Sequence, residues 1–100
     1  MKDILVYYDP NHGNCLRKMT PISENKYVIN GAYGSDEGKK GHWVSFAEKI
    51  DLINKNGRKY NLKVDFSLKN IKTHEPIYYA YMHNRKIEWQ DGNTWLQLYA

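Results

Sequence analysis

Apolar and polar residues alternate with a period of two along much of this 100-residue chain, which is the pattern of β-strands. The clearest run is 60–68, and weaker runs occupy 3–8, 15–22 and 26–33, with three short strands expected within 76–100. Clusters of Gly, Pro, Asn and Asp separate the runs. About eight short strands in sequence order predict an all-β fold, a single antiparallel meander that closes as a barrel or a two-layer sandwich.

Residues 42–54 fit two structures. Ser45 and Glu48 form a capping-box pattern that favours a short helix within 45–55. The strand phase of the same segment and the following Asn56-Gly57 favour a long hairpin instead. In that hairpin a three-residue loop over 55–57 would place Phe46 opposite Phe66 and Leu52 opposite Tyr60. We favour the hairpin and keep the helix as the alternative.

Gly31 interrupts the β-like run 26–33. A glycine inside a strand often marks a bulge or a place where another group approaches the backbone closely. We expect one of these two features at Gly31.

The last quarter of the chain, 76–100, predicts three strands joined by tight turns at Asn84-Arg85 and Asp91-Gly92. A loop of two or four residues at Asp91-Gly92 would pair Ile87 with Leu96. The resulting core face contains Tyr78, Ala80, Met82, Ile87, Trp89, Leu96 and Leu98, and the opposite face contains Ile77, Tyr79, Tyr81, Trp95 and Tyr99.

The second face is unusually aromatic, and we interpret it as a binding surface formed by Tyr79, Tyr81, Lys86, Trp95 and Tyr99. A protein partner or self-association, with Trp and Tyr as anchors, is the favoured occupant. The alternatives are a single-stranded nucleic acid held by base stacking, and a sugar or small apolar ligand in a barrel mouth. The competing interpretation is that these rings pack against the rest of the chain.

The charge of the chain is mildly basic, with a formal net charge of +4 and a pI near 9.1. Lys59, Lys63 and Lys69 share one strand face and form a secondary basic surface. Such a stripe is usually a solvated sheet face, and phosphate contact is the alternative function.

Catalysis is less expected than binding, and we expect neither a cofactor nor a metal. His12 and Cys15 have a spacing that zinc can use, but no second ligand pair lies near them in sequence. His12, His42 and His83 lie near predicted turns, so a small His-dependent nuclease is the enzymatic alternative. Sequence spacing does not show whether these groups meet.

The chain is expected to be one domain, 1–100, in a soluble intracellular protein of the cytoplasm. Its single cysteine excludes an intramolecular disulfide, and no apolar run reaches the length of a membrane span. We therefore expect no membrane partner.

Overall fold

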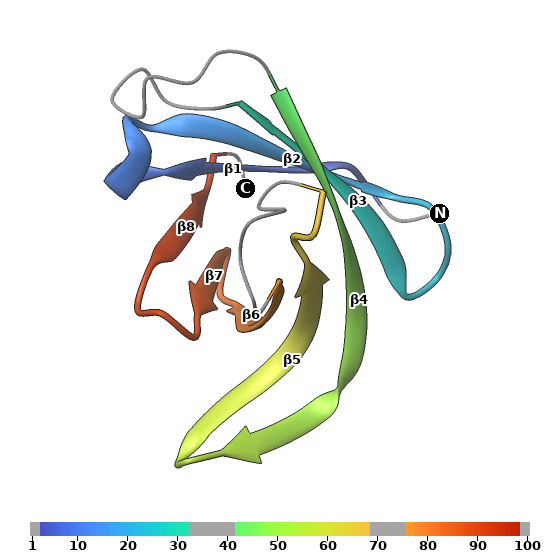
Figure 1. Cartoon of the computed structure of the whole chain (residues 1–100), viewed down its shortest axis with the longest axis vertical. Coiled ribbons are helices and arrows are strands. Elements are labelled where there is room, and N and C mark those ends of the chain that lie inside the picture. The colour runs from blue at the N-terminus through green and yellow to red at the C-terminus, as the bar shows by residue number, and fades with distance from the viewer. Residues whose placement is uncertain (1–2, 33–41, 69–75, 99–100) are drawn as a thin grey trace.

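The protein folds into a closed antiparallel barrel of eight strands, seen here in a computed structural model that describes residues 3–32, 42–68 and 76–98 (Figure 1). Each strand pairs with the next along the chain, and β1 pairs with β8 to close the barrel. The predicted all-β meander is confirmed, and of the two expected closures the barrel is the one formed. The strands are β1 (Leu5–Asp9), β2 (Cys15–Pro21), β3 (Lys26–Ala32), β4 (His42–Lys55), β5 (Arg58–Asp65), β6 (Ile77–His83), β7 (Lys86–Trp89) and β8 (Thr94–Gln97), with a 3-10 helix η1 (Pro10–His12) between β1 and β2.

The barrel interior is filled by every second side chain of each strand, as the period-two pattern requires. Met19, Ile29, Leu62 and Ile87 are completely buried. Aromatic rings fill much of the remaining space in the interior. The buried core consists of Tyr7, Met19, Tyr27, Ile29, Trp43, Ala47, Leu62, Val64, Phe66, Ala80, Ile87, Trp89 and Trp95.

The segment that allowed two interpretations is a strand, so the short helix expected as an alternative within 45–55 is wrong. β4 and β5 form a long hairpin that extends past the rest of the barrel (Figure 1). Its turn is the two-residue Asn56-Gly57, with φ of 54° and 79°. Asn tolerates the left-handed conformation, so a type I′ turn forms and the predicted three-residue loop does not.

The register of this hairpin changes along its length. Ile53 pairs with Tyr60 near the tip, and Lys49 pairs with Leu62 beyond an irregularity on β4. Phe46 then lies opposite Asp65, not opposite Phe66 as predicted, and its side chain is exposed. The extra β4 residues form a bulge, which moves the side chains of one strand relative to the other.

The turn between β6 and β7 follows the prediction. Asn84 and Arg85 adopt φ of 47° and 63°, and Met82 pairs with Ile87. Both central residues therefore have the positive φ of a two-residue type I′ turn.

The turn between β7 and β8 does not follow the prediction. The amide of Trp89 donates to the carbonyl of Asn93, so the loop contains the three residues 90–92, with Gly92 at φ 92°. Ile87 consequently pairs with Trp95 and not with Leu96. Because a shift of one residue reverses the faces of a strand, Trp95 points into the core and its side chain is only 4% exposed.

Gly31 lies where the barrel has no space for a side chain. A Cβ at this position would overlap the Cζ2 and Cε2 atoms of Trp43, which lies directly across the β3–β4 ladder. The expected close approach is therefore present, and the indole ring of Trp43 covers the backbone at Gly31.

Candidate functional site

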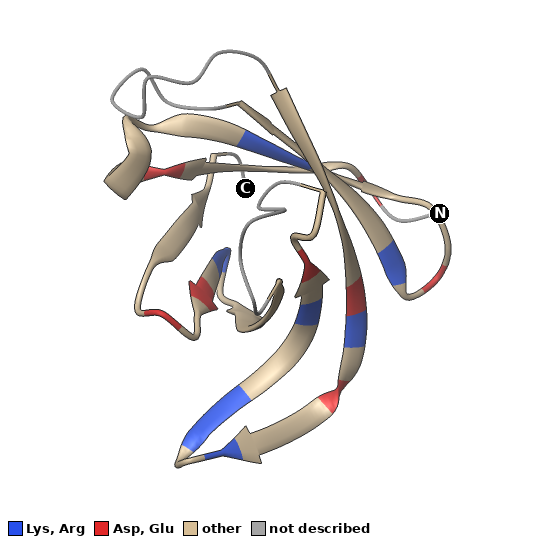
Figure 2. Ribbon diagram, viewed as in Figure 1, with Lys and Arg blue, Asp and Glu red and all other residues tan. Residues whose placement is uncertain are grey.

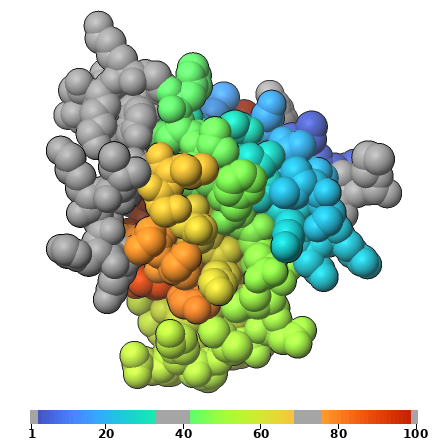
Figure 3. Space-filling model, turned by 45° about the vertical axis from the view of Figure 1, so that its right-hand side comes forward, coloured from blue at the N-terminus to red at the C-terminus, as the bar shows by residue number. Residues whose placement is uncertain are grey.

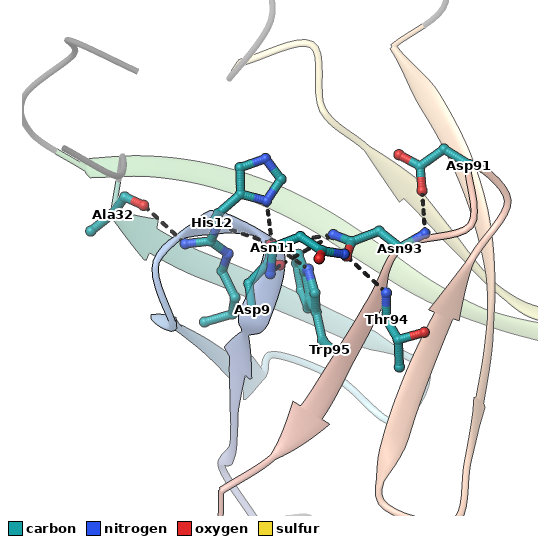
Figure 4. Close-up of polar contacts among 9 residues, drawn as sticks. Asp9, Asn11, His12, Ala32, Asp91, Asn93, Thr94 and Trp95 are labelled. Carbon is teal, nitrogen blue, oxygen red and sulfur yellow. Dashed lines mark hydrogen bonds and ion pairs between the residues drawn. The ribbon is translucent and has the colours of Figure 1, made fainter. Parts of the chain in front are cut away.

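Asp9 organises one end of the barrel, where β1 ends and η1 begins (Figure 4). Its side chain is buried, and its Oδ1 accepts from the amide of Asn11 at 3.2 Å, which caps η1. Its Oδ2 accepts from the indole Nε1 of Trp95 at 3.0 Å and lies 2.9 Å from Nδ1 of His12. The Nδ2 of Asn93 lies 3.3 Å from both carboxylate oxygens. One carboxylate thus joins β1, η1 and the start of β8.

Arg17 is the charged partner of Asp9 in the barrel interior. Its Nη2 donates to Asp9 Oδ2 at 3.3 Å, and its Nη1 donates to the carbonyl of Ala32 at 2.9 Å (Figure 4). The guanidinium carbon lies 5.1 Å from the ring centroid of Trp43 and 5.6 Å from that of Trp95, close enough for cation–π attraction. A buried ion pair needs such additional partners, because desolvation offsets much of its Coulomb energy.

A cavity of about 150 Å³, here called the mouth cavity, opens beside this pair. Its apolar wall consists of the rings of Phe66, Tyr78, Trp89 and Trp95. Its polar wall consists of Asp9, His12, Arg17, Asp91 and Asn93. An aromatic cavity with a few converging polar groups has the composition of a small-molecule site.

The sequence analysis did not identify Asp9 or Arg17 as site residues. Arg17 lies two positions before Met19 on β2, so both side chains point to the same side of the strand, and Met19 is completely buried. A charged residue on the side of the strand that faces the core was the one sequence feature that could have indicated Arg17. Nothing in the sequence indicated that Trp95 and Asn93, more than 80 residues away, would meet Asp9.

The predicted aromatic binding surface is only partly formed. Tyr79 and Tyr81 point outward from β6 and are partly exposed, and Lys86 follows on β7. Trp95 does not belong to this face, because the three-residue loop before β8 places its ring in the core. Tyr99 and Lys69 lie outside the described residues. The binding role of Tyr79, Tyr81 and Lys86 stays a prediction.

Tyr79 lies under the tip of the β4–β5 hairpin. The Nζ of Lys55 is 4.7 Å from its ring centroid, and the ring of Tyr60 is 6.0 Å away. Arg58 donates from Nη1 to the carbonyl of Gln90 at 3.0 Å, which ties the tip to the end of β7. Two hollows are lined by Arg58 and Tyr60, one of them bordered by Tyr79 and the other by Tyr81.

Tyr81 stacks on His83, with ring centroids 4.2 Å apart. The Nε2 of His83 lies 3.0 Å from a carboxylate oxygen of Glu88, and Lys86 is 3.4 Å from the other oxygen. The hydrogen bond to His83 is the main reason that the pKa of Glu88 lies below its ordinary value, with a smaller contribution from Lys86. One aromatic stack and one charge network therefore fix the outer surface of the β6–β7 hairpin.

The basic residues of the second hairpin are divided between two places. Lys59 lies at the hairpin tip beside Lys55 and Arg58, where Figure 2 shows a concentration of positive charge. Lys63 lies further along β5, between Glu48 of β4 and Tyr79 of β6. The face around Lys63 therefore carries both signs of charge.

An apolar region lies on the outward-facing surface of β4, β5 and β6, which lie side by side (Figure 3). Phe46, which is 48% exposed, and Ile77 flank Asp65 in one cross-strand row. A hollow of about 410 Å³ adjoins them, and Ile22 and Lys63 also line it. We call Phe46, Ile77, Tyr79 and Tyr81, with the intervening Lys63, the outer face.

The histidines and the cysteine do not form one recognisable centre. His12 contacts Asp9 at the mouth cavity, and His83 contacts Glu88 on the β6–β7 hairpin. His42 is exposed at the start of β4, and Cys15 is a free thiol at the start of β2. Within 3–32, 42–68 and 76–98 no group of three or more His, Cys, Asp or Glu side chains is placed to hold a metal ion.

The chain is similar to a curated protein, the outer membrane usher protein CssD of Escherichia coli, with 27% identity over 97 residues. The match covers 93% of this chain but only 12% of the usher, so the chain spans about an eighth of that protein's length. No protein-family description matches the chain, and no solved structure does. Across the described ranges there is no helix of sufficient length and hydrophobicity to cross a bilayer. The expected intracellular location stays a prediction.

Proposed function

We propose that this barrel is a non-enzymatic binding module that docks another protein on its outer face. The observation that carries the proposal is the exposure of Phe46 beside Ile77 on the same sheet surface as Tyr79 and Tyr81. Partly exposed aromatic and aliphatic residues with hollows beside them are typical anchors of protein interfaces.

The charges of the outer face favour a protein over a nucleic acid. Lys26, Glu48 and Lys63 face one another across β3, β4 and β5, so cationic and anionic side chains alternate there. Asp65 adds a further carboxylate between Phe46 and Ile77. A surface that binds a phosphate backbone carries a continuous positive potential, whereas mixed charge suits a protein partner.

The state of the tyrosine rings also favours a protein. Lys55 lies over Tyr79, and His83 is stacked on Tyr81. An unpaired base that stacked on the same side of either ring would first have to displace these groups, and stacking is the main attraction in sequence-independent binding of single strands. A protein side chain can enter the hollows beside the rings and leave both contacts intact.

The proposal is tested by selecting binders from a peptide library displayed on phage against the folded domain. Tyr81→Ala should weaken the selected peptides by about 30-fold, the effect of truncating an interface anchor. The matched control is Tyr8→Ala on β1, a partly exposed tyrosine outside the outer face, which should leave binding unchanged.

Two results would contradict the proposal. Selected peptides that are insensitive to Tyr81→Ala and to Phe46→Ala would show that the outer face does not bind them. An oligothymidylate that binds the domain, weakens steeply with salt and loses affinity with Lys59→Glu, but not with Lys18→Glu on β2, would establish the nucleic-acid alternative. Lys18 is an exposed strand lysine like Lys59, so both variants change the net charge equally.

A further inference from the structure

Two buried hydrogen-bond donors lack an acceptor at the mouth cavity. They are Nε of Arg17 and Nε1 of Trp89, and both residues line the cavity. Neither atom has a hydrogen-bond partner anywhere in the described part of the chain. Both side chains are at most 3% exposed, and buried donors in native proteins are nearly always paired. Both atoms belong to residues of the cavity wall and have almost no accessible surface, so an acceptor from outside the chain pairs with them only when the side chains of the wall shift to admit it.

The shape of the cavity limits what that acceptor belongs to. The ring centroids of Phe66 and Trp89 are 5.4 Å apart, and those of Trp89 and Trp95 are 4.6 Å apart, so the apolar wall is a tightly packed group of aromatic rings. The volume of about 150 Å³ matches that of an engineered cavity that admits one benzene molecule. A single flat ring is therefore a group of suitable size for this space.

The charges around the cavity favour a neutral ligand. The carboxylates of Asp9 and Asp91 both border it and would repel an anion. A cation would compete with the guanidinium of Arg17, which already lies over the ring of Trp95 and pairs with Asp9. A neutral carbonyl or hydroxyl oxygen accepts from both donors without either conflict.

We propose that the mouth cavity binds a neutral, single-ring aromatic molecule that carries a carbonyl or hydroxyl acceptor. The ring packs against Phe66, Trp89 and Trp95, and the oxygen accepts from Trp89 Nε1 and Arg17 Nε. This site lies in the barrel interior and is separate from the outer face, so each proposal stands or fails independently of the other.

The test uses benzamide as the probe and the indole N–H resonances of the uniformly 15N-labelled full chain as the readout. Trp89→Phe identifies the Trp89 resonance by its disappearance. Benzamide at millimolar concentration should move the Trp89 signal in a saturable way. Benzoate and benzylammonium should bind more weakly because of their charges. Toluene, which has the ring but no acceptor, should bind about 5- to 100-fold more weakly, as expected for two lost hydrogen bonds.

Two variants distinguish this site from the outer face. Trp89→Phe keeps an aromatic ring and removes one of the two donors, so it should weaken benzamide binding about 2- to 10-fold, which is less than the loss of the ligand oxygen. The binding to this variant is followed through the Trp95 signal. Tyr81→Ala should not change benzamide binding. A Trp89 signal that benzamide does not move, or moves no more than toluene does, would overturn the proposal and leave water as the acceptor of these two donors.

Discussion

Trp95 shows how one side chain depends on the length of a neighbouring loop. Its indole contacts Trp89 and donates to Asp9, yet an even-numbered loop at Asp91-Gly92 would have placed it on the surface. Asp-Gly fits both a two-residue type I′ turn and the end of a three-residue loop with Gly in the left-handed conformation. The local sequence does not separate these turns. The preference comes from burial of the indole and from its hydrogen bond to Asp9.

Replacing Trp95 tests its placement in the core. Trp95→Ala should lower the free energy of unfolding by about 3–5 kcal/mol, because a large buried ring is lost and a cavity remains. Trp95→Phe keeps most of the packing and loses the bond to Asp9, so it should cost less. Urea denaturation followed by circular dichroism measures both.

Trp89→Ala is the reference for this comparison, since Trp89 is buried in the predicted and in the observed register. Comparable losses for Trp95→Ala and Trp89→Ala confirm the core position. A change of about 0.5 kcal/mol or less for Trp95→Ala, the range of ordinary surface substitutions, would refute it.

At the scale of elements, the strands followed from the sequence more reliably than their registers. Period-two alternation defined β5 and most other strands, because it reports which residues face the interior. The registers depended on turn type. The turn at Asn84-Arg85 has the predicted length and gave the correct pairing. The loop at Asn56-Gly57 has two residues where three were predicted, and the loop at Asp91-Gly92 has three where two or four were predicted. The irregularity on β4 between Lys49 and Ile53 was not predicted, and it shifts the pairing of the rest of the hairpin.

The β3–β4 pair offers a test of packing between a backbone and a ring. Gly31→Ala should destabilise the protein by about 1–3 kcal/mol, because the added Cβ meets the buried ring of Trp43. That ring cannot move freely, since it packs against Phe66 and Trp95. Thermal and urea unfolding give the measurement.

The control for Gly31→Ala is Asn30→Ala at the adjacent, exposed position of β3. It should change stability by no more than about 0.5 kcal/mol. Equal stabilities of the two variants would mean that Trp43 adapts to the methyl group at no cost, contrary to the expected close packing.

At the scale of the whole molecule, the sequence predicted an eight-stranded meander but left its closure open. A barrel and a sandwich use the same alternation, and the difference lies in whether β1 pairs with β8. That pairing is short, with Tyr7 opposite Gln97 and Tyr8 opposite Leu96. Asp9 reinforces it through Trp95 and Asn93. Both the closure and the mouth cavity therefore depend on contacts between distant chain ends, which local sequence patterns do not report.

The closure gives the stability of the molecule a specific dependence on alkaline pH. Tyr7 of β1 is 2% exposed, and burial, with a smaller contribution from Tyr27, raises the pKa of Tyr7 to about 12. An unfolded tyrosine titrates at about 10. Below about pH 10 the Tyr7 hydroxyl is neutral in both the folded and the unfolded chain, so its contribution to the free energy of unfolding is fully present. As the pH rises from about 10 through about 12, the hydroxyl ionises first in the unfolded chain, which stabilises that state, and the contribution is lost.

Removing the Tyr7 hydroxyl should therefore reduce the alkaline loss of stability. In urea titrations from neutral pH to above pH 10, the free energy of unfolding of Tyr7→Phe should decline less steeply than that of the unsubstituted chain. Tyr8→Phe on the outward side of β1 should follow the unsubstituted chain. The comparison isolates one group, because the other groups that titrate at alkaline pH are common to both proteins. If Tyr7→Phe and the unsubstituted chain lose stability in parallel above pH 10, burial of the hydroxyl at the β1–β8 closure has no such effect.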